Sequence, residues 1–200
     1  MEKVLIGAGG FAREIKAHMN DFSMKCFVDD KYYKKNTDNI LPLSEFDATK
    51  YQALIAVGDP RGRFDLVQRL PKDTKYFTFI HSSAILLGND IEIGEGSIIC
   101  AGAILTTNIK IGKHAHINIQ STIGHDCTIG DYFTTAPGVN ISGNCKIYDM
   151  VYVGTSAAIK QELTIHSGAT IGLNAGVVKH IEESGIYTGV PAKKLVTTTT

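Results

Sequence analysis

The sequence predicts a two-part protein: a small α/β domain with a Rossmann-like parallel sheet over residues 1–80, and an all-β parallel helix with a C-terminal tail over residues 81–200. Two observations lead to this prediction. A glycine-rich turn joins a strand pattern to a helix pattern near the N-terminus, and strand and helix patterns then alternate. From Leu87 to Val177, every sixth residue is aliphatic in fifteen of sixteen positions, Thr135 being the exception. A fixed short period is typical of a solenoid.

Residues 1–80 are expected to alternate between buried strands and amphipathic helices. The predicted elements are a strand at Lys3–Ile6, a helix at Phe11–Asn20, strands at Lys25–Val28 and Ala53–Val57, a helix at Phe64–Leu70 and a strand at Tyr76–Ile80. Because strand and helix alternate, the sheet should be parallel.

The turn after the first strand, Gly7-Ala8-Gly9-Gly10-Phe11-Ala12, matches a variant of the dinucleotide fingerprint. Its glycines allow close approach of a phosphate to a helix N-terminus. A complete dinucleotide domain needs two such halves, and about eighty residues supply only one. The segment therefore favours a single nucleotide diphosphate, as in a nucleotide-linked sugar. The alternative is that the glycines only pack helix against strand.

The remaining candidate substrate contacts of this domain lie at the ends of the later strands. Asp29 and Asp30 end the second strand, where an acidic side chain meets a ribose hydroxyl in this fold. Gly58 and Asp59 form the turn after the third strand, and Arg63 starts the helix behind it. Arg63 is interpreted either as a phosphate contact or as a solvated residue at the helix start.

The period of six in the second half fits neither an amphipathic helix nor a strand meander. Four residues after each aliphatic position stands a small or apolar residue, as an inward-facing corner requires. Glycine follows the aliphatic residue at positions 88, 94, 112, 124, 130, 154 and 172. We expect these glycines to supply the strained backbone of tight turns.

His125 and Asp126 are the candidate chemical pair. They take the two outward positions after inward Ile123. A carboxylate beside an imidazole can fix its tautomer and stabilise the imidazolium, which suits a general base. Adjacent His and Asp residues also occur in ordinary loops, so the pair alone is not specific.

Composition excludes several classes of function. Twenty basic and twenty acidic residues give zero formal charge, which argues against a nucleic-acid partner. No apolar run is long enough to span a membrane, and the first residues lack a signal-peptide core, so we expect a cytoplasmic protein. The four cysteines include no Cys-x-x-Cys pair, and no metal site is expected.

The repeat resembles that of the hexapeptide-repeat acyltransferase family. Residues 118–131, which contain Gly124-His125-Asp126, look like the catalytic stretch of the branch that acetylates sialic acids or nucleotide-linked 4-amino-4,6-dideoxy sugars. The glycine turn, Val28-Asp29-Asp30 and the ending Thr188–Lys194 extend the match over nearly the whole chain. The resemblance implies a left-handed helix with residues eighteen apart stacked, acetyl-CoA as co-substrate, and a homotrimer with active sites between subunits.

The same resemblance implies roles for individual residues. His125 corresponds to the general base, Asp126 to its acidic partner, and Gly143 to the residue whose N–H stabilises the oxyanion. Four residues fall where relatives line the coenzyme A groove: Gly154, Ser156, Gly172 and Ala175. Val190, Pro191 and Lys193 correspond to the segment that closes over coenzyme A or the nucleotide. Gly154 and Gly172 could equally be turn residues of the repeat.

One position departs from the family pattern. Many relatives have a second histidine nine residues after the base, which helps to position the acetyl group, and this chain has Thr134 there. A hydroxyl can still donate a hydrogen bond, so Thr134 is kept as a substrate-contact candidate.

The sequence therefore predicts an N-acetyltransferase that acts on the 4-amino group of a nucleotide-linked dideoxy sugar, in the synthesis of a bacterial surface glycan. The nearest alternative is O-acetylation of sialic acid or another sugar by the same base. A metal-dependent hydratase would need His114, His116 and His125 to converge, and a non-enzymatic nucleotide-sugar binding protein is the third class. The nucleotide base and the sugar stereochemistry stay open.

Overall fold

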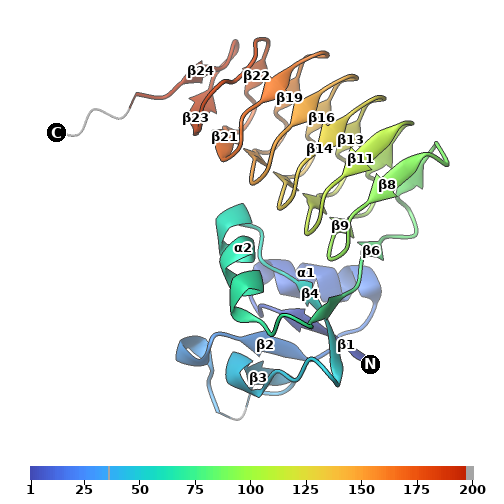
Figure 1. Ribbon diagram of the computed structural model, residues 1–200, viewed down its shortest axis with the longest axis vertical. Coiled ribbons are helices and arrows are strands. Elements are labelled where there is room, and N and C mark those ends of the chain that lie inside the picture. The colour runs from blue at the N-terminus through green and yellow to red at the C-terminus, as the bar shows by residue number, and fades with distance from the viewer. Residues whose placement is uncertain (36, 197–200) are drawn as a thin grey trace.

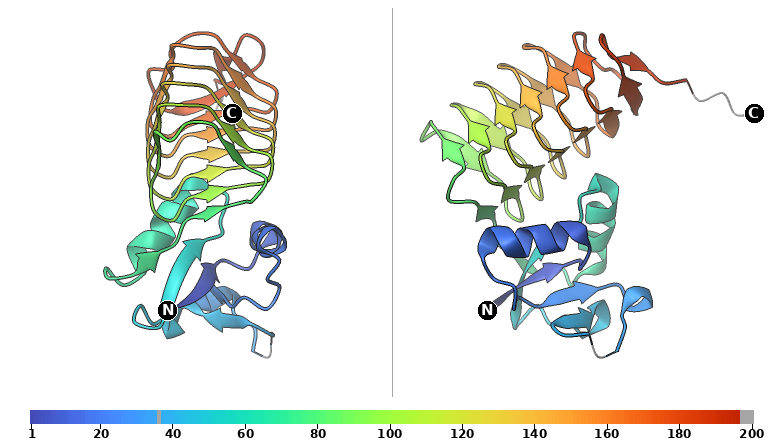
Figure 2. Two further views of the ribbon diagram at one scale, coloured as in Figure 1. Left: turned by 90° about the vertical axis from the view of Figure 1, so that its right-hand side faces the viewer. Right: turned by 180° about the vertical axis from the view of Figure 1, so that it is seen from behind.

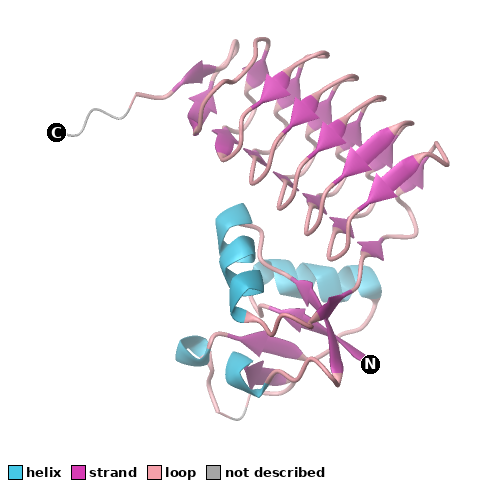
Figure 3. Ribbon diagram, in the orientation of Figure 1, coloured by secondary structure: helices cyan, strands magenta, loops and turns pink. Residues whose placement is uncertain are grey.

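The computed structural model describes residues 1–35 and 37–196 and contains two parts, an N-terminal part and an elongated C-terminal part (Figure 1). All helices lie in the N-terminal part, and the C-terminal part is built from short strands and turns (Figure 3). The end of the predicted tail, residues 197–200, lies outside the described residues.

The N-terminal part is built on a five-stranded parallel sheet with the order β3-β2-β1-β4-β5. Its strands are β1 (Glu2–Ile6), β2 (Cys26–Val28), β3 (Ile40–Pro42), β4 (Tyr51–Ile55) and β5 (Lys75–Tyr76). β1 and β4 pair in the middle, and their apolar residues are fully buried because both faces of the sheet are covered.

Helices cover the two faces of this sheet. α1 (Gly10–Met19) packs Ala12 and Ile15 into the cluster that contains Leu5, while α2 (Pro60–Arg69) lies against the opposite face. α2 begins with Asp59, whose side chain accepts from the Gly62 N–H, and with proline in its first turn. Two short 3-10 helices, η1 (Asp30–Tyr32) and η2 (Leu43–Glu45), lie in the connection between β2 and β4.

Two elements of this part differ from expectation. β3 was not predicted, because it is a three-residue edge strand that ends in proline. The single strand expected at Tyr76–Ile80 is two strands: β5 belongs to the N-terminal sheet, whereas β6 (Phe79–Ile80) pairs with β9 and is the first strand of the solenoid.

The C-terminal part is a parallel β-helix whose strands form three stacked sheets (Figure 2). Sheet I has eight strands: β6, β9 (Ile98–Ile99), β12 (His116–Ile117), β15 (Thr134–Thr135), β18 (Tyr152–Val153), β21 (Ala169–Ile171), β23 (Gly185–Thr188) and β24 (Lys193–Lys194). All of them are parallel except β24.

The other two sides are sheets II and III. Sheet II comprises β7 (Ile85–Leu86), β10 (Ile104–Leu105), β13 (Thr122–Ile123), β16 (Asn140–Ile141), β19 (Ala158–Ile159) and β22 (Gly176–Val177). Sheet III comprises β8 (Ile91–Ile93), β11 (Ile109–Ile111), β14 (Thr128–Ile129), β17 (Lys146–Ile147) and β20 (Thr164–Ile165). The chain runs through sheets I, II and III in turn, so each coil has a I–II edge, a II–III edge and a III–I edge.

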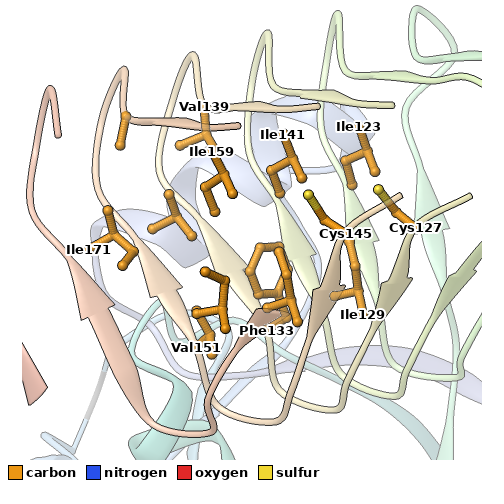
Figure 4. Close-up of a cluster of buried hydrophobic side chains, with 14 of the residues drawn as sticks. Ile123, Cys127, Ile129, Phe133, Val139, Ile141, Cys145, Val151, Ile159 and Ile171 are labelled. Carbon is orange, nitrogen blue, oxygen red and sulfur yellow. The ribbon is translucent and has the colours of Figure 1, made fainter. Parts of the chain in front are cut away.

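The predicted inward positions from Ile99 to Val177 form the core of the β-helix, and Ile93 packs half-buried against it. The first predicted position, Leu87, is wrong: its side chain is 68% exposed, because Leu86 rather than Leu87 pairs with Leu105. Ile123 pairs with Ile141, and Ile141 with Ile159, so residues eighteen apart stack in one row (Figure 4). Cys127 and Cys145 lie side by side in the same interior and are free thiols. Thr135 is fully buried, and its hydroxyl satisfies both the Asn118 N–H and the Ser121 hydroxyl.

The glycines that follow the aliphatic positions do not have the predicted role. One residue in each hexad has a positive φ, but it stands at another position of the hexad. Most of these residues are not glycine, and Asn108, Asp126 and Asn144 are among them. The glycines are required by close stacking: a Cβ on Gly94 would lie 2.5 Å from the Gly112 carbonyl carbon in the next coil. Glycine therefore recurs after the aliphatic positions because there is no room for a Cβ between adjacent coils, and not because the backbone there needs a positive φ.

Candidate active site

The II–III edge carries the His125–Asp126 pair in the turn between β13 and β14. His125 Nδ1 lies 2.6 Å from Asp126 Oδ2. Both side chains are accessible, at 62% and 48% exposure. Asp126 is the left-handed residue of this turn, with φ of 59°. The pair therefore presents an oriented imidazole to the outside of the β-helix.

Hydrogen bonds hold the carboxylate in its ionised form. The side-chain amide of Asn108 donates to Asp126 Oδ1 at 2.6 Å. This bond, followed by the bond to His125, lowers the pKa of Asp126. A carboxylate that stays charged at Nδ1 leaves Nε2 as the nitrogen that can accept a proton.

Gly143 lies directly against the imidazole, one coil farther along the same edge. A Cβ at Gly143 would be 2.6 Å from His125 Nε2, so only glycine leaves the ring its place. Within residues 1–35 and 37–196, no acceptor takes the Gly143 N–H. A free N–H beside a basic nitrogen is the arrangement that acyl transfer requires: a proton acceptor and an oxyanion donor at one point.

The N-terminal domain contains a separate cleft of about 890 Å³ at the carboxyl ends of its strands. Five of the predicted substrate-contact residues line it: Gly7, Gly9, Gly10, Asp29 and Gly58. Carboxyl ends of parallel strands are the usual ligand position in this type of sheet. The volume suits a nucleotide-sized ligand.

Several cleft residues were missed by sequence reasoning. Tyr32, Lys34 and Arg69 also line the cleft, and Arg69 Nη1 lies 2.6 Å from Asp29 Oδ2. Lys34 is not among the substrate contacts predicted from the sequence. Its position shortly after the acidic end of the second strand was a usable signal, whereas Arg69 is brought to Asp29 only by the fold.

Two acidic residues predicted as substrate contacts have hydrogen-bond partners within the chain. Asp30 does not line the cleft, because its Oδ1 accepts from the Ser44 N–H at 3.0 Å at the start of η2. Asp59 caps α2 by accepting from the Gly62 N–H at 2.6 Å. Asp59 also lines a second groove of about 690 Å³, between the start of α2 and sheet I.

The predicted phosphate contact of Arg63 is wrong, and so is its alternative as a solvated residue. Arg63 is fully buried, and its guanidinium donates to the carbonyls of Val57 and Gly58 on one side. On the other side it donates to acceptors in the β-helix, namely the carbonyls of His114, Tyr132 and Phe133 and the Thr134 hydroxyl. Burial lowers its pKa to about 9, still above neutral pH. Arg63 therefore joins the two parts of the chain.

Thr134 also serves this junction. Its side chain is almost fully buried, and its hydroxyl donates to the Gly58 carbonyl at 3.1 Å while accepting from Arg63. The hydroxyl is thus engaged within the chain, which corrects the expectation that it contacts substrate.

The residues predicted to line the coenzyme A groove divide into two groups. The Ala175 side chain is in the core, which corrects its predicted role. Gly154 and Gly172 pack against the next coil, where a Cβ would lie 2.7 Å from Leu173 N and 3.0 Å from Thr188 Oγ1, respectively. Ser156, Val190, Pro191 and Lys193 are exposed and remain candidates. Ser156 lies in a turn of the I–II edge.

Within one chain, the candidate groups lie on different sides of the β-helix. The N-terminal part contacts sheet I and the III–I edge through Arg63 and through Phe11, whose ring lies 5.0 Å from that of His116. His125, Asp126 and Gly143 lie on the II–III edge, which is opposite sheet I. The chain thus brings His125, Asp126 and Gly143 together, but places them away from its own N-terminal cleft.

No metal centre is found among the residues that the structure describes, in which no three His, Cys, Asp or Glu side chains converge. His114 and His116 are buried at the junction of the two parts, far from the edge that carries His125. The hydratase alternative therefore has no three-histidine cluster within a chain. No helix in the described ranges has the length and apolar character of a membrane span.

Comparisons with known proteins agree with this architecture. Residues 4–70 match the PglD N-terminal domain. GDP-perosamine N-acetyltransferase of Escherichia coli O157:H7 is 32% identical over 171 residues, which cover 78% of this chain and 77% of that protein.

Two solved structures are similar over nearly their full lengths. WeeI from Acinetobacter baumannii AYE has a TM-score of 0.86 and 34% identity, covering 98% of this chain and 100% of that one. The acetyltransferase domain of PglB from Neisseria gonorrhoeae FA1090, in complex with acetyl coenzyme A, has a TM-score of 0.83 and 26% identity, covering 97% and 98%. The predicted fold, an α/β domain followed by a left-handed parallel β-helix, is confirmed.

Proposed function

Because the chain belongs to the hexapeptide-repeat acyltransferase family, in the branch with the sugar N-acetyltransferases, we propose that it acetylates the 4-amino group of a nucleotide-linked 4-amino-4,6-dideoxy sugar. The chain is an acetyl-CoA-dependent acyltransferase. One observation carries the assignment of the site: the exposed imidazole of His125 is paired with Asp126 and lies against Gly143.

In the proposed mechanism, transfer is direct. His125 Nε2 removes a proton from the sugar amine as the nitrogen attacks the thioester carbonyl. The carbonyl oxygen becomes an oxyanion that accepts a hydrogen bond from the Gly143 N–H. The C–S bond then breaks, and the imidazolium returns its proton so that coenzyme A leaves as the thiol. Asp126 stabilises the imidazolium between these steps.

The N-terminal cleft is the proposed site for the nucleotide diphosphate. The glycine turn and the start of α1 offer backbone N–H groups, and Lys34 and Arg69 add positive charge. A single mononucleotide-sized cleft favours a nucleotide-linked sugar over a dinucleotide. The relative from E. coli O157:H7 supports GDP-perosamine as the first sugar to test.

We propose that the complete site lies between subunits of a homotrimer. His125 is on the II–III edge, opposite the sheet that contacts the chain's own N-terminal part. A neighbouring subunit would have to bring its nucleotide cleft to this edge, and the exposed residues of the I–II edge, Ser156 and Val190 among them, would then border coenzyme A. The proposed setting of the reaction is the synthesis of a bacterial surface glycan such as O-antigen.

The experiment that tests this function measures acetyl-CoA consumption as free thiol. The acceptors are GDP-, dTDP- and UDP-linked 4-amino-4,6-dideoxy sugars, with free sialic acid as the O-acetylation control, for wild type and His125→Ala. We expect turnover on one amino sugar that is lost in the variant. Turnover on sialic acid alone would replace the proposal with O-acetylation, and activity that survives His125→Ala would remove the assigned base.

A further inference from the structure

We propose that Asn108 is a positioning residue for the base, acting through the Asp126 carboxylate on the His125 imidazole. This inference rests on the proposed function. Asn108 touches neither the ring nor, in the mechanism above, any reacting atom. It lies one coil before Asp126, in the turn between β10 and β11.

The two oxygens of Asp126 have one partner each. Oδ2 faces His125 Nδ1 at 2.6 Å, and Oδ1 accepts from Asn108 Nδ2 at the same distance. A carboxylate held at only one oxygen could rotate and exchange its oxygens, and about half of this side chain is exposed to water. The second hydrogen bond fixes the carboxylate plane, and therefore the direction from which it meets the imidazole.

The fold places the amide at this point. Asn108 and Asp126 are eighteen residues apart and both have left-handed backbones, with φ of 50° and 59°. Asparagine and aspartate tolerate this conformation better than other residues with a side chain. The Asp126 N–H also donates to the Thr107 carbonyl at 3.2 Å, which ties the two turns together.

The segment that carries Asn108 is itself fixed from the coil before it. The Thr107 hydroxyl lies 3.0 Å from each carboxylate oxygen of Asp90. A chain of polar contacts thus runs along the II–III edge from Asp90 through the Thr107–Asn108 turn to Asp126, and ends at the imidazole.

The contact is specific to this coil. Asn144 occupies the equivalent position one coil after Asp126, with φ of 57°. In the part of the chain that the structure describes, its side chain makes no hydrogen bond. The Asn108 amide is therefore not a general feature of the stacked turns, and Asn144 provides a matched control.

The expected consequence concerns the imidazole tautomer. With the carboxylate fixed, the proton of the neutral ring stays on Nδ1, and Nε2 keeps its lone pair toward the Gly143 side. Without Asn108, the carboxylate can turn away, and part of the population carries the proton on Nε2, where it cannot accept one from the amine.

The kinetic test uses Asn108→Gly, since glycine accepts the left-handed backbone. We expect kcat to fall about tenfold and the KM for both substrates to change less than about twofold. Asn144→Gly should leave kcat within about twofold of wild type. In an Asp126→Asn background, Asn108→Gly should cause no further loss, because its effect passes through the carboxylate. Equal losses in both glycine variants, or additive losses in the double variant, would overturn the inference.

A second measurement does not depend on activity. Long-range ¹H–¹⁵N spectra of protein with labelled histidine, with His125 assigned by its absence in His125→Ala, report which ring nitrogen carries the proton. We expect Nδ1 in wild type at pH 8 and a mixture in Asn108→Gly. An unchanged tautomer in the variant would overturn the positioning role. If the wild-type protein acetylates none of the sugars tested, the proposed function fails. The spectrum still shows whether Asn108 controls the tautomer of His125.

Discussion

At the scale of single residues, Gly143 controls where the imidazole can lie. Its φ is not in the left-handed region, so alanine is acceptable to the backbone, but the new Cβ would lie 2.6 Å from His125 Nε2 and 2.7 Å from Cε1. The ring must therefore move. We predict that Gly143→Ala lowers kcat by about a hundredfold while the unfolding midpoint changes little. Steady-state kinetics and circular dichroism check this.

The chemical pair was predictable from the sequence, whereas its support was only partly so. His125 and Asp126 are adjacent in the chain, so their pairing needed no knowledge of the fold. Asn108 was within reach of the eighteen-residue register, but the register does not say which stacked side chains bond. Arg63 was not predictable, because its partners His114 and Thr134 lie more than fifty residues away.

At the scale of elements, the glycines of the β-helix fall into two classes with different costs of substitution. Gly102 has a positive φ of 67°, yet its Cβ would meet nothing closer than 3.5 Å. Gly94 has an ordinary backbone, but its Cβ would lie within 2.6 Å of the Gly112 carbonyl group and of Lys113 N. The first substitution strains one residue, and the second forces two coils apart.

We therefore predict that Gly94→Ala destabilises the protein more than Gly102→Ala. The expected losses in the free energy of unfolding are about 3 kcal/mol for Gly94→Ala and about 1 kcal/mol for Gly102→Ala. Urea denaturation of the two variants checks the order. The reverse order would mean that torsion angle, as the sequence first suggested, governs these positions.

The spacing of the repeat explains why most of this architecture could be predicted. Each hexad repeats the same inward position, so a single residue that is not aliphatic does not hide the register. Thr135 is such a residue, and it still points into the core because its hydroxyl bonds to that of Ser121. Short elements with no such repetition, such as β3, have only local preferences to indicate them, and those were too weak.

At the scale of the whole molecule, the junction of the two parts should make stability depend on pH. Burial lowers the pKa of His114 to about 4 and that of His116 well below its ordinary value. Both rings are therefore neutral in the folded protein but become charged in the unfolded chain below about pH 6.5. The unfolded state then binds more protons, so stability is complete above this pH and is lost as the pH falls toward 4.

We predict that the free energy of unfolding at pH 5.0 is lower than at pH 7.5 by about 2 kcal/mol from His114 alone, with a further loss from His116. Carboxylates with a lowered pKa, such as Asp47 at about 2, change the free energy of unfolding only below about pH 4. They therefore do not contribute to the difference between pH 5.0 and pH 7.5. Urea titrations at fixed protein concentration measure the effect, and His116→Phe should reduce it. Equal stabilities at the two pH values would contradict the burial of these rings.

The separation of His125 from its own chain's nucleotide cleft leads to a prediction about assembly. His125→Ala removes the proposed base. Gly9→Glu places a carboxylate in the cleft at the start of α1, where phosphate is proposed to bind. Gly9 has open space around it, so the fold should tolerate the change. Each variant alone should be inactive.

If each site takes its base from one subunit and its cleft from the next, refolding the two variants together creates some sites with neither substitution. Thiol release on the accepted sugar should then reappear in the mixture, in assemblies with the mass of a trimer. A mixture that stays silent, although mixed trimers have formed, would place the complete site within one chain and require the cleft to reach the II–III edge by movement of the N-terminal domain.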